Sequence, residues 1–189
     1  MGLLNPISDA EESERKALTP RVDTLDGKRI GLLSNGKPAA GPILSVVEER
    51  LSERHPDAEF EQFSVPEFNM LKDTETLEDI RAWASETDLD VVISAMGDCG
   101  SCTKFLAWGT EYVEKAGVPA VGLIDEGFEM DWKSNAIEKG RPLRYNKIPV
   151  RCEVTDLDRI RSDLTDDAVD AIVDELIRPL EATETTEDS

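Results

Sequence analysis

Two cysteines separated by two small residues carry the clearest chemical signal in the sequence. Cys99 and Cys102 enclose Gly100 and Ser101, and the motif follows an apolar run that ends at Ala95. The pattern predicts that this CxxC ends a strand and opens a helix, where unpaired backbone N–H groups and the helix dipole favour a thiolate over a thiol. A thiolate with a second cysteine three residues on can attack an electrophile and then be released by its neighbour. The pair therefore indicates a redox or nucleophilic site, with Cys99 as the nucleophile and Cys102 as the resolving residue.

Other interpretations of the two cysteines stay open at the level of sequence. Half of a zinc site is one, but the chain has no second CxxC, its single histidine is His55, and the third cysteine, Cys152, falls in an expected strand. A pair of inert, buried cysteines is another. A structural disulfide is disfavoured in a reducing cytoplasm. We therefore predict a redox pair and no metal site.

Apolar runs and amphipathic stretches alternate along the chain from Lys28 onward and predict the fold class. Strands are expected at residues 29–34, 58–65, 90–95, 118–124 and 145–152, helices from residue 42 and at 76–86, 103–116 and 165–180, and an irregular stretch at 129–142. Parallel strands need crossover helices, so the alternation predicts a three-layer α/β fold with a mostly parallel five-stranded sheet, flavodoxin-like or Rossmann-like. In that strand order the first and third strands are neighbours.

Ligands bind such a sheet beyond the carboxyl ends of its strands. The three loops there are residues 35–38, 97–103 and 125–128. We expect Lys37 to supply a cation that stabilises the thiolate and Asn35 to orient a substrate carbonyl or carboxylate. Ser101 and Thr103 could donate to a bound oxyanion, and Glu126 could act as a general acid. Each also has a plain structural interpretation, as a surface lysine, a turn residue, a helix cap or part of an exposed loop.

Asp98 directly precedes the expected nucleophile. A carboxylate that points at a sulfur would raise the pKa of that thiol. We therefore interpret Asp98 as a turn residue or a hydrogen-bond acceptor at the end of the strand.

Two common nucleotide-binding motifs are missing from the sequence. There is no GxGxxG after the first strand and no GxxxxGK[ST]. The stretch from Ser34 to Lys37 is only a weak version of the hydroxyl-rich loop of a flavin site. We therefore predict no bound cofactor and expect an external thiol or electron donor.

The charge of the chain excludes several classes of partner. The 189 residues include 21 Lys and Arg against 41 Asp and Glu, for a formal net charge of −20. Surplus carboxylates repel phosphate and anionic headgroups, so we expect neither nucleic acid nor a membrane as partner. Spread over every segment, the charge is typical of proteins from salt-accumulating organisms. The rival interpretation is an acidic surface for a basic partner, with residues 181–189 as the best candidate.

Length and segment composition predict the organisation of the chain. Residues 28–181 are expected to form one α/β domain, and residues 182–189 an acidic disordered tail. Residues 1–27 are polar and are expected to form an N-terminal arm, with at most one short helix at 10–17, that packs on the same domain or builds a homo-oligomer. Because no apolar run approaches the ~18 residues of a spanning helix and the N-terminus lacks the pattern of a signal peptide, we expect a cytoplasmic protein.

Four segments share the residues of one known family in the same order. They are LDGKRIGLLSNGKP at 25–38, VVISAMGDCGSCT at 91–103, EKAGVP at 114–119 and EGF at 126–128. Together they resemble the UGSC family of (seleno)proteins, which is named for a selenocysteine-Gly-Ser-Cys motif. The resemblance implies a redox nucleophile at Cys99, where members carry selenocysteine or cysteine. It implies no particular substrate.

We therefore predict a thiol-dependent oxidoreductase or transferase of the UGSC type that acts on a small-molecule, anionic substrate. A thioredoxin-like disulfide exchanger is disfavoured, because the CxxC follows the third strand and no cis-proline strand is recognisable opposite it. The alternative from a different class is a non-catalytic ligand-binding or subunit protein with structural cysteines.

Overall fold

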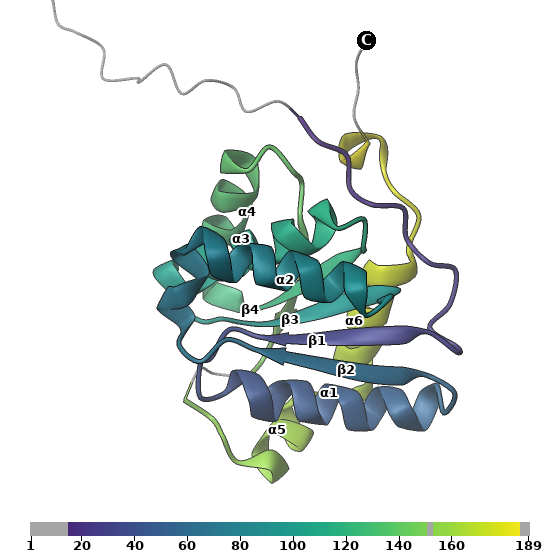
Figure 1. The fold of residues 1–189 in the computed structure, drawn as a ribbon. Coiled ribbons are helices and arrows are strands. Elements are labelled where there is room, and N and C mark those ends of the chain that lie inside the picture. The colour runs from purple at the N-terminus through teal and green to yellow at the C-terminus, as the bar shows by residue number, and fades with distance from the viewer. Residues whose placement is uncertain (1–14, 151–152, 186–189) are drawn as a thin grey trace, which may run out of the picture.

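A parallel sheet of five strands forms the centre of the fold in the computed structural model, which describes residues 15–150 and 153–185 (Figure 1). The strands are β1 (Arg29–Ser34), β2 (Glu59–Ser64), β3 (Val91–Gly97), β4 (Ala120–Asp125) and β5 (Arg144–Ile148), in the order β2-β1-β3-β4-β5. Every neighbouring pair is parallel. The predicted α/β class is confirmed, and β1 and β3 are neighbours as expected.

Helices cover both faces of this sheet and complete the three layers (Figure 1). They are α1 (Ala40–Arg54), α2 (Thr74–Glu86), α3 (Gly100–Lys115), α4 (Glu129–Glu138), α5 (Leu157–Asp163) and α6 (Asp166–Ile177), with short 3-10 turns η1 (Phe68–Lys72), η2 (Glu126–Phe128) and η3 (Ala182–Glu184). One face packs against α1, α5 and α6, and the other against α2, α3 and α4. None of the helices in the described part of the chain has the length and apolar character to cross a membrane.

Burial on both faces explains the sequence of the strands. All seven residues of β3 are buried, because a central strand is covered by helices above and below. The edge strand β2 behaves differently: Phe60 packs against the core on the α1 side, and Phe63 against the core on the α2 and α3 side. The two rings therefore lie on opposite faces of the sheet. This is why Phe60 and Phe63 do not follow the alternation of apolar and polar residues that a strand buried on one face shows.

The prediction of an irregular stretch at residues 129–142 is wrong, because α4 occupies most of it. Trp132 anchors this helix: its ring is fully buried against β4, where a Cβ on Gly122 would overlap it, and its Nε1 donates to the carbonyl of Leu143 at 3.0 Å. Met130 and Ile137 on the same helix are exposed. Only part of the apolar content of α4 faces the core, so the helical period is weak in the sequence.

The first and last described segments pack against each other and on the domain. Residues 15–22 of the arm form no helix, and the remainder of the expected helix lies outside the described residues. Leu18 is buried, and its N–H donates to the carbonyl of Glu184 at 2.9 Å. The disordered tail expected from residue 182 is wrong for residues 182–185: η3 forms there because the buried Glu184 carboxylate accepts from the Arg144 guanidinium at 2.7 Å and 2.8 Å. Residues 186–189 lie outside the described residues.

Candidate functional site

The CxxC motif lies where β3 passes into α3, so the predicted strand-to-helix position is confirmed. Cys99 is the N-cap of α3, with an extended backbone, and Gly100 is the first helical residue. The Cys102 N–H donates to Cys99 Sγ at 3.1 Å, and the Thr103 N–H donates to the Cys99 carbonyl at 2.8 Å. A side chain that caps a helix in this way receives both an N–H bond and the positive end of the helix dipole.

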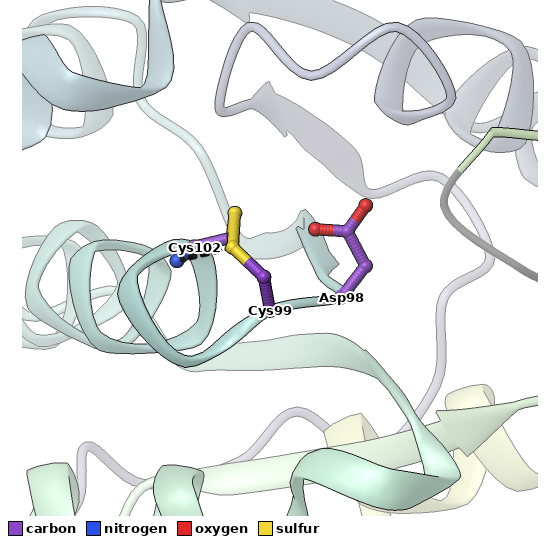
Figure 2. Close-up of side chains that lie close together, drawn as sticks. All are labelled: Asp98, Cys99 and Cys102. Atoms are coloured by element: carbon purple, nitrogen blue, oxygen red, sulfur yellow. Dashed lines mark hydrogen bonds between the residues drawn. A yellow bond between two sulfur atoms is a disulfide. The ribbon is translucent and has the colours of Figure 1, made fainter.

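Cys99 and Cys102 are joined by a disulfide, with their Cα atoms 5.0 Å apart (Figure 2). Cys102 is fully buried, whereas Cys99 is half-buried. A reagent from solution therefore meets Cys99 first, and Cys102 lies behind it within bonding distance. An attacking and a resolving cysteine would require such an asymmetry.

Asp98 is a further candidate site residue, although its sequence position indicated only a turn residue or a hydrogen-bond acceptor. Its carboxylate lies beside the cysteines, so that one of its oxygens and the two sulfurs all lie within 4.8 Å of one another (Figure 2). The Asp98 side chain is 1% exposed, and Lys37 Nζ is 3.9 Å from its Oδ1. The signal in the sequence was its place directly before Cys99, together with the expected meeting of the loops after β1 and β3.

Lys37 reaches the Asp98 carboxylate from the loop after β1, and its role toward a thiolate or a substrate stays a prediction. Its Nζ lies 5.4 Å from the centre of the Phe68 ring, which adds a cation–π contact to the ion pair with Asp98. Its side chain is 23% exposed, so Lys37 is partly enclosed between these groups. The expected cation is therefore placed next to the carboxylate that borders the sulfurs.

Asn35 holds the two loops together. Its Nδ2 donates to the carbonyl of Met96 at 2.8 Å, and its Oδ1 accepts from the Lys37 N–H at 3.2 Å. The side chain is fully buried. Both ends of the carboxamide thus bind backbone, which fits the turn interpretation; a contact between Asn35 and a substrate stays a prediction.

The two expected hydroxyl donors have different environments. Ser101 is exposed, with its Oγ 3.5 Å from Cys99 Sγ, so it borders the accessible sulfur. Thr103 is fully buried, and its Oγ1 has no hydrogen-bond partner among the described residues. It lies against Gly97, where a Cβ would come within 3.0 Å of this oxygen. Ser101 therefore lies exposed beside Cys99, whereas Thr103 is enclosed; a contact of either residue with a substrate stays a prediction.

The loop after β4 borders the site through the start of α4. Glu126 is exposed in η2, and no hydrogen bond or ion pair of the described residues joins it to the cysteine loop. A Cβ on Gly100 would lie 3.7 Å from Oδ1 of Asp131, which places the first turn of α4 beside the motif. The role of Glu126 as a general acid stays a prediction.

A separate hollow of about 580 Å³ lies along β5, between α4 and α6. Its lining includes Tyr145 and Lys147, and Glu129 accepts hydrogen bonds from both. Lys133 donates to the same carboxylate at 2.6 Å. These three hydrogen bonds lower the pKa of Glu129 to about 2. The charges along this hollow are thus paired with one another, and it does not include the cysteines.

Comparison with known proteins identifies the family. The family model for the UGSC family matches residues 2–178, which is most of the chain. No curated protein and no solved structure matches it. The chain therefore belongs to the UGSC family, as its motifs indicated.

Proposed function

We propose that this protein is a thiol-dependent oxidoreductase or transferase that uses Cys99 as its nucleophile. The observation that carries the proposal is the unequal burial of the two cysteines at the N-terminus of α3. Cys99 is half-buried, whereas Cys102, to which it is bonded, is fully buried. A purely structural disulfide needs no such asymmetry.

The first half of the cycle consumes the reduced pair. Where the electrophile is a sulfur of a small-molecule disulfide, the Cys99 thiolate attacks it, forms a mixed disulfide and expels the other half as a thiolate, which takes up a proton. The Cys102 thiol loses its proton and attacks Cys99 Sγ. This closes the internal disulfide and releases the second half of the substrate. Two electrons pass from the cysteine pair to the substrate, and an external dithiol returns them by the reverse exchange.

Two features of the loop favour this chemistry at Cys99. The Cys102 N–H points at its sulfur, and the sixteen-residue helix α3 presents its positive end there. The Asp98 carboxylate disfavours the thiolate form of Cys99, because like charges repel. Lys37, 3.9 Å from that carboxylate, offsets its charge. The loop thus balances a nearby negative charge with a cation and a helix end.

The groups at the open side of the site suit a small anion. The Lys37 side chain is 23% exposed, and the Ser101 hydroxyl lies 3.5 Å from Cys99 Sγ. Both can bind a carboxylate or a similar group of a substrate. We therefore propose a small anionic substrate, with Lys37 and Ser101 as its binding residues.

Exchange with a chromogenic disulfide tests the proposal. The reduced chain, with Cys152→Ser to remove the third thiol, is mixed with dithiobis(nitrobenzoate), an anionic disulfide. We expect the parent to release two nitrothiolates per chain and to end as the internal disulfide. Cys102→Ser should release one and keep a mixed disulfide on Cys99, seen in its intact mass. If the parent stops at two stable mixed disulfides, Cys102 does not resolve Cys99 and the proposal is wrong.

A non-catalytic ligand-binding protein is the second candidate. The hollow along β5 favours it, since about 580 Å³ is within the range of small-molecule pockets, roughly 300–1,000 Å³, and it lies apart from the cysteines. On this alternative, Cys99→Ser leaves the affinity for the ligand unchanged.

A further inference from the structure

We propose that the reduced loop binds a zinc ion through Asp98, Cys99 and Cys102. The inference needs only that the disulfide can be reduced, and it does not depend on the nucleophilic role proposed above. Thiolate sulfur with one carboxylate oxygen is a donor set that suits zinc and not magnesium or calcium.

The placement of the three ligand atoms supports such a site. Asp98, Cys99 and Cys102 project to the same side of one short loop (Figure 2). The carboxylate oxygen and both sulfurs lie within 4.8 Å of one another. Around a tetrahedral zinc, with Zn–S of about 2.3 Å and Zn–O of about 2.1 Å, the ligand atoms lie roughly 3.5–3.8 Å apart. Once the S–S bond is reduced, small side-chain rotations are enough to reach these separations.

The charges of the loop match a divalent cation. Two thiolates and the Asp98 carboxylate carry three negative charges, and Lys37, 3.9 Å from that carboxylate, contributes one positive charge. A zinc ion brings this group to neutrality. Neutralisation matters because Asp98 and Cys102 are buried, where uncompensated charge is costly.

The burial of the ligands predicts an open coordination position. Cys102 and Asp98 are enclosed, whereas Cys99 is half-buried and Ser101 beside it is exposed. Three protein ligands with a fourth position toward solvent is the arrangement of zinc sites that bind a water or a substrate group. The expectation of no metal site considered cysteine and histidine as ligands, and the Asp98 carboxylate adds a third ligand to the two cysteines.

Zinc binding and disulfide formation exclude each other, because each uses both sulfurs. Zinc therefore protects the reduced pair from oxidation, and oxidation releases zinc. The loop then has two states, a metal-bound dithiolate and a metal-free disulfide.

Cobalt and zinc titrations of the full chain test the inference, again with Cys152→Ser. The reduced protein should bind one Co²⁺ per chain with thiolate-to-cobalt absorption and the visible bands of a tetrahedral site, and Zn²⁺ should displace it. Asp98→Asn should weaken zinc binding by at least about tenfold in competition with a chromogenic chelator, since losing even an outer partner of a metal ligand costs that much. Asp131→Asn removes the neighbouring carboxylate of α4 and is the matched control; it should leave the affinity unchanged.

Three outcomes would overturn the zinc site: equal affinities of the reduced and oxidised proteins, equal affinities of Asp98→Asn and the parent, or an octahedral cobalt spectrum. Asp98→Glu keeps the carboxylate and should recover part of the affinity if Asp98→Asn folds poorly. The disulfide-exchange assay is run with a chelator present, so its failure bears on the proposed function and leaves the metal site untouched.

Discussion

The two ends of helix α3 differ in how their reactive and charged side chains are buried and paired. At its C-terminal half, two carboxylates are buried and surrounded by donors and cations from distant segments. At its N-terminal end, the cap is a half-buried cysteine. The C-terminal half of α3 thus carries buried, paired charges, whereas its N-terminal end carries a partly exposed cysteine.

Glu114 shows how the far end is fixed. Its carboxylate accepts from the Arg21 guanidinium at 2.7 Å, from the Thr19 N–H at 2.7 Å and from the Ala120 N–H at 2.9 Å. One turn earlier, Glu111 lies within 4 Å of three basic side chains. Carboxylates at a helix C-terminus oppose the dipole, so these contacts must offset that cost as well as desolvation.

The contacts at the two ends of α3 differ in kind. The buried carboxylates of Glu111 and Glu114 face basic side chains, and Glu114 attaches the N-terminal arm to the helix. The opposite end leaves Cys99 half-buried, as the proposed reaction with a substrate requires. Variants at each end distinguish contacts that stabilise the fold from contacts proposed to serve the reaction.

The largest effect is expected from Glu114→Gln. This change leaves the buried Arg21 guanidinium without its counter-charge; burial already lowers the pKa of Arg21. We expect a loss of about 3 kcal/mol in the free energy of unfolding, measured with urea. Glu78→Gln, which breaks an exposed pair with Arg81, is the control and should cost less than about 0.5 kcal/mol. Equal losses for the two variants would show that the arm contact does not hold α3.

Lys37→Met is expected to act on chemistry at the other end. The rate of exchange with the anionic dithiobis(nitrobenzoate) should fall about tenfold, because the variant lacks the cation at the site. The rate with neutral dithiodipyridine should stay within a factor of two or so of the parent. Lys104→Met, on the exposed side of α3, is the matched control. A parallel fall with both reagents would mean that Lys37 acts through the loop structure and not through charge.

Salt should change the same rate by a smaller factor. A net charge of −20 repels an anionic reagent, and the Debye length shrinks from about 10 Å at 0.1 M salt to about 3 Å at 1 M. We expect the rate with the anionic disulfide to rise several-fold over this range, while the rate with dithiodipyridine changes little. Stopped-flow absorbance measures both, and a fall in the anionic rate would indicate that the local cation outweighs the whole surface.

The smallest effect is expected from Glu129, which lies outside both ends of α3. Its pKa is lowered to about 2 by hydrogen bonds from Lys133, Tyr145 and Lys147, so its contribution to stability is present above its usual pKa, 4.5, and is lost as the pH falls toward 2. Glu129→Gln lacks the titrating carboxylate, so its urea midpoint should fall less steeply between pH 5 and pH 3 than that of the parent. Glu126→Gln is the control, and an unchanged slope for Glu129→Gln would contradict the assignment.

Local patterns predicted β1, β3 and the position of the CxxC, because apolar runs and helix starts are encoded by neighbouring residues. Features that depend on distant contacts were not predictable. The sequence around Glu114 is typical of a surface residue, and its burial depends on contacts with the N-terminal arm. Glu184 is ordered by Arg144, forty residues earlier. Asp98 was visible in the sequence, but its approach to both sulfurs required the geometry of the loop.

The central claim is that Cys99 is the accessible nucleophile and Cys102 the enclosed resolving thiol. The direct measurement uses two variants in the Cys152→Ser background, each reduced beforehand and then mixed with dithiodipyridine. Cys102→Ser gives the second-order rate constant of Cys99, and Cys99→Ser gives that of Cys102. We expect Cys99 to react faster by a factor on the order of 10², since Cys102 is fully buried. Equal rates, or a faster Cys102, would contradict it.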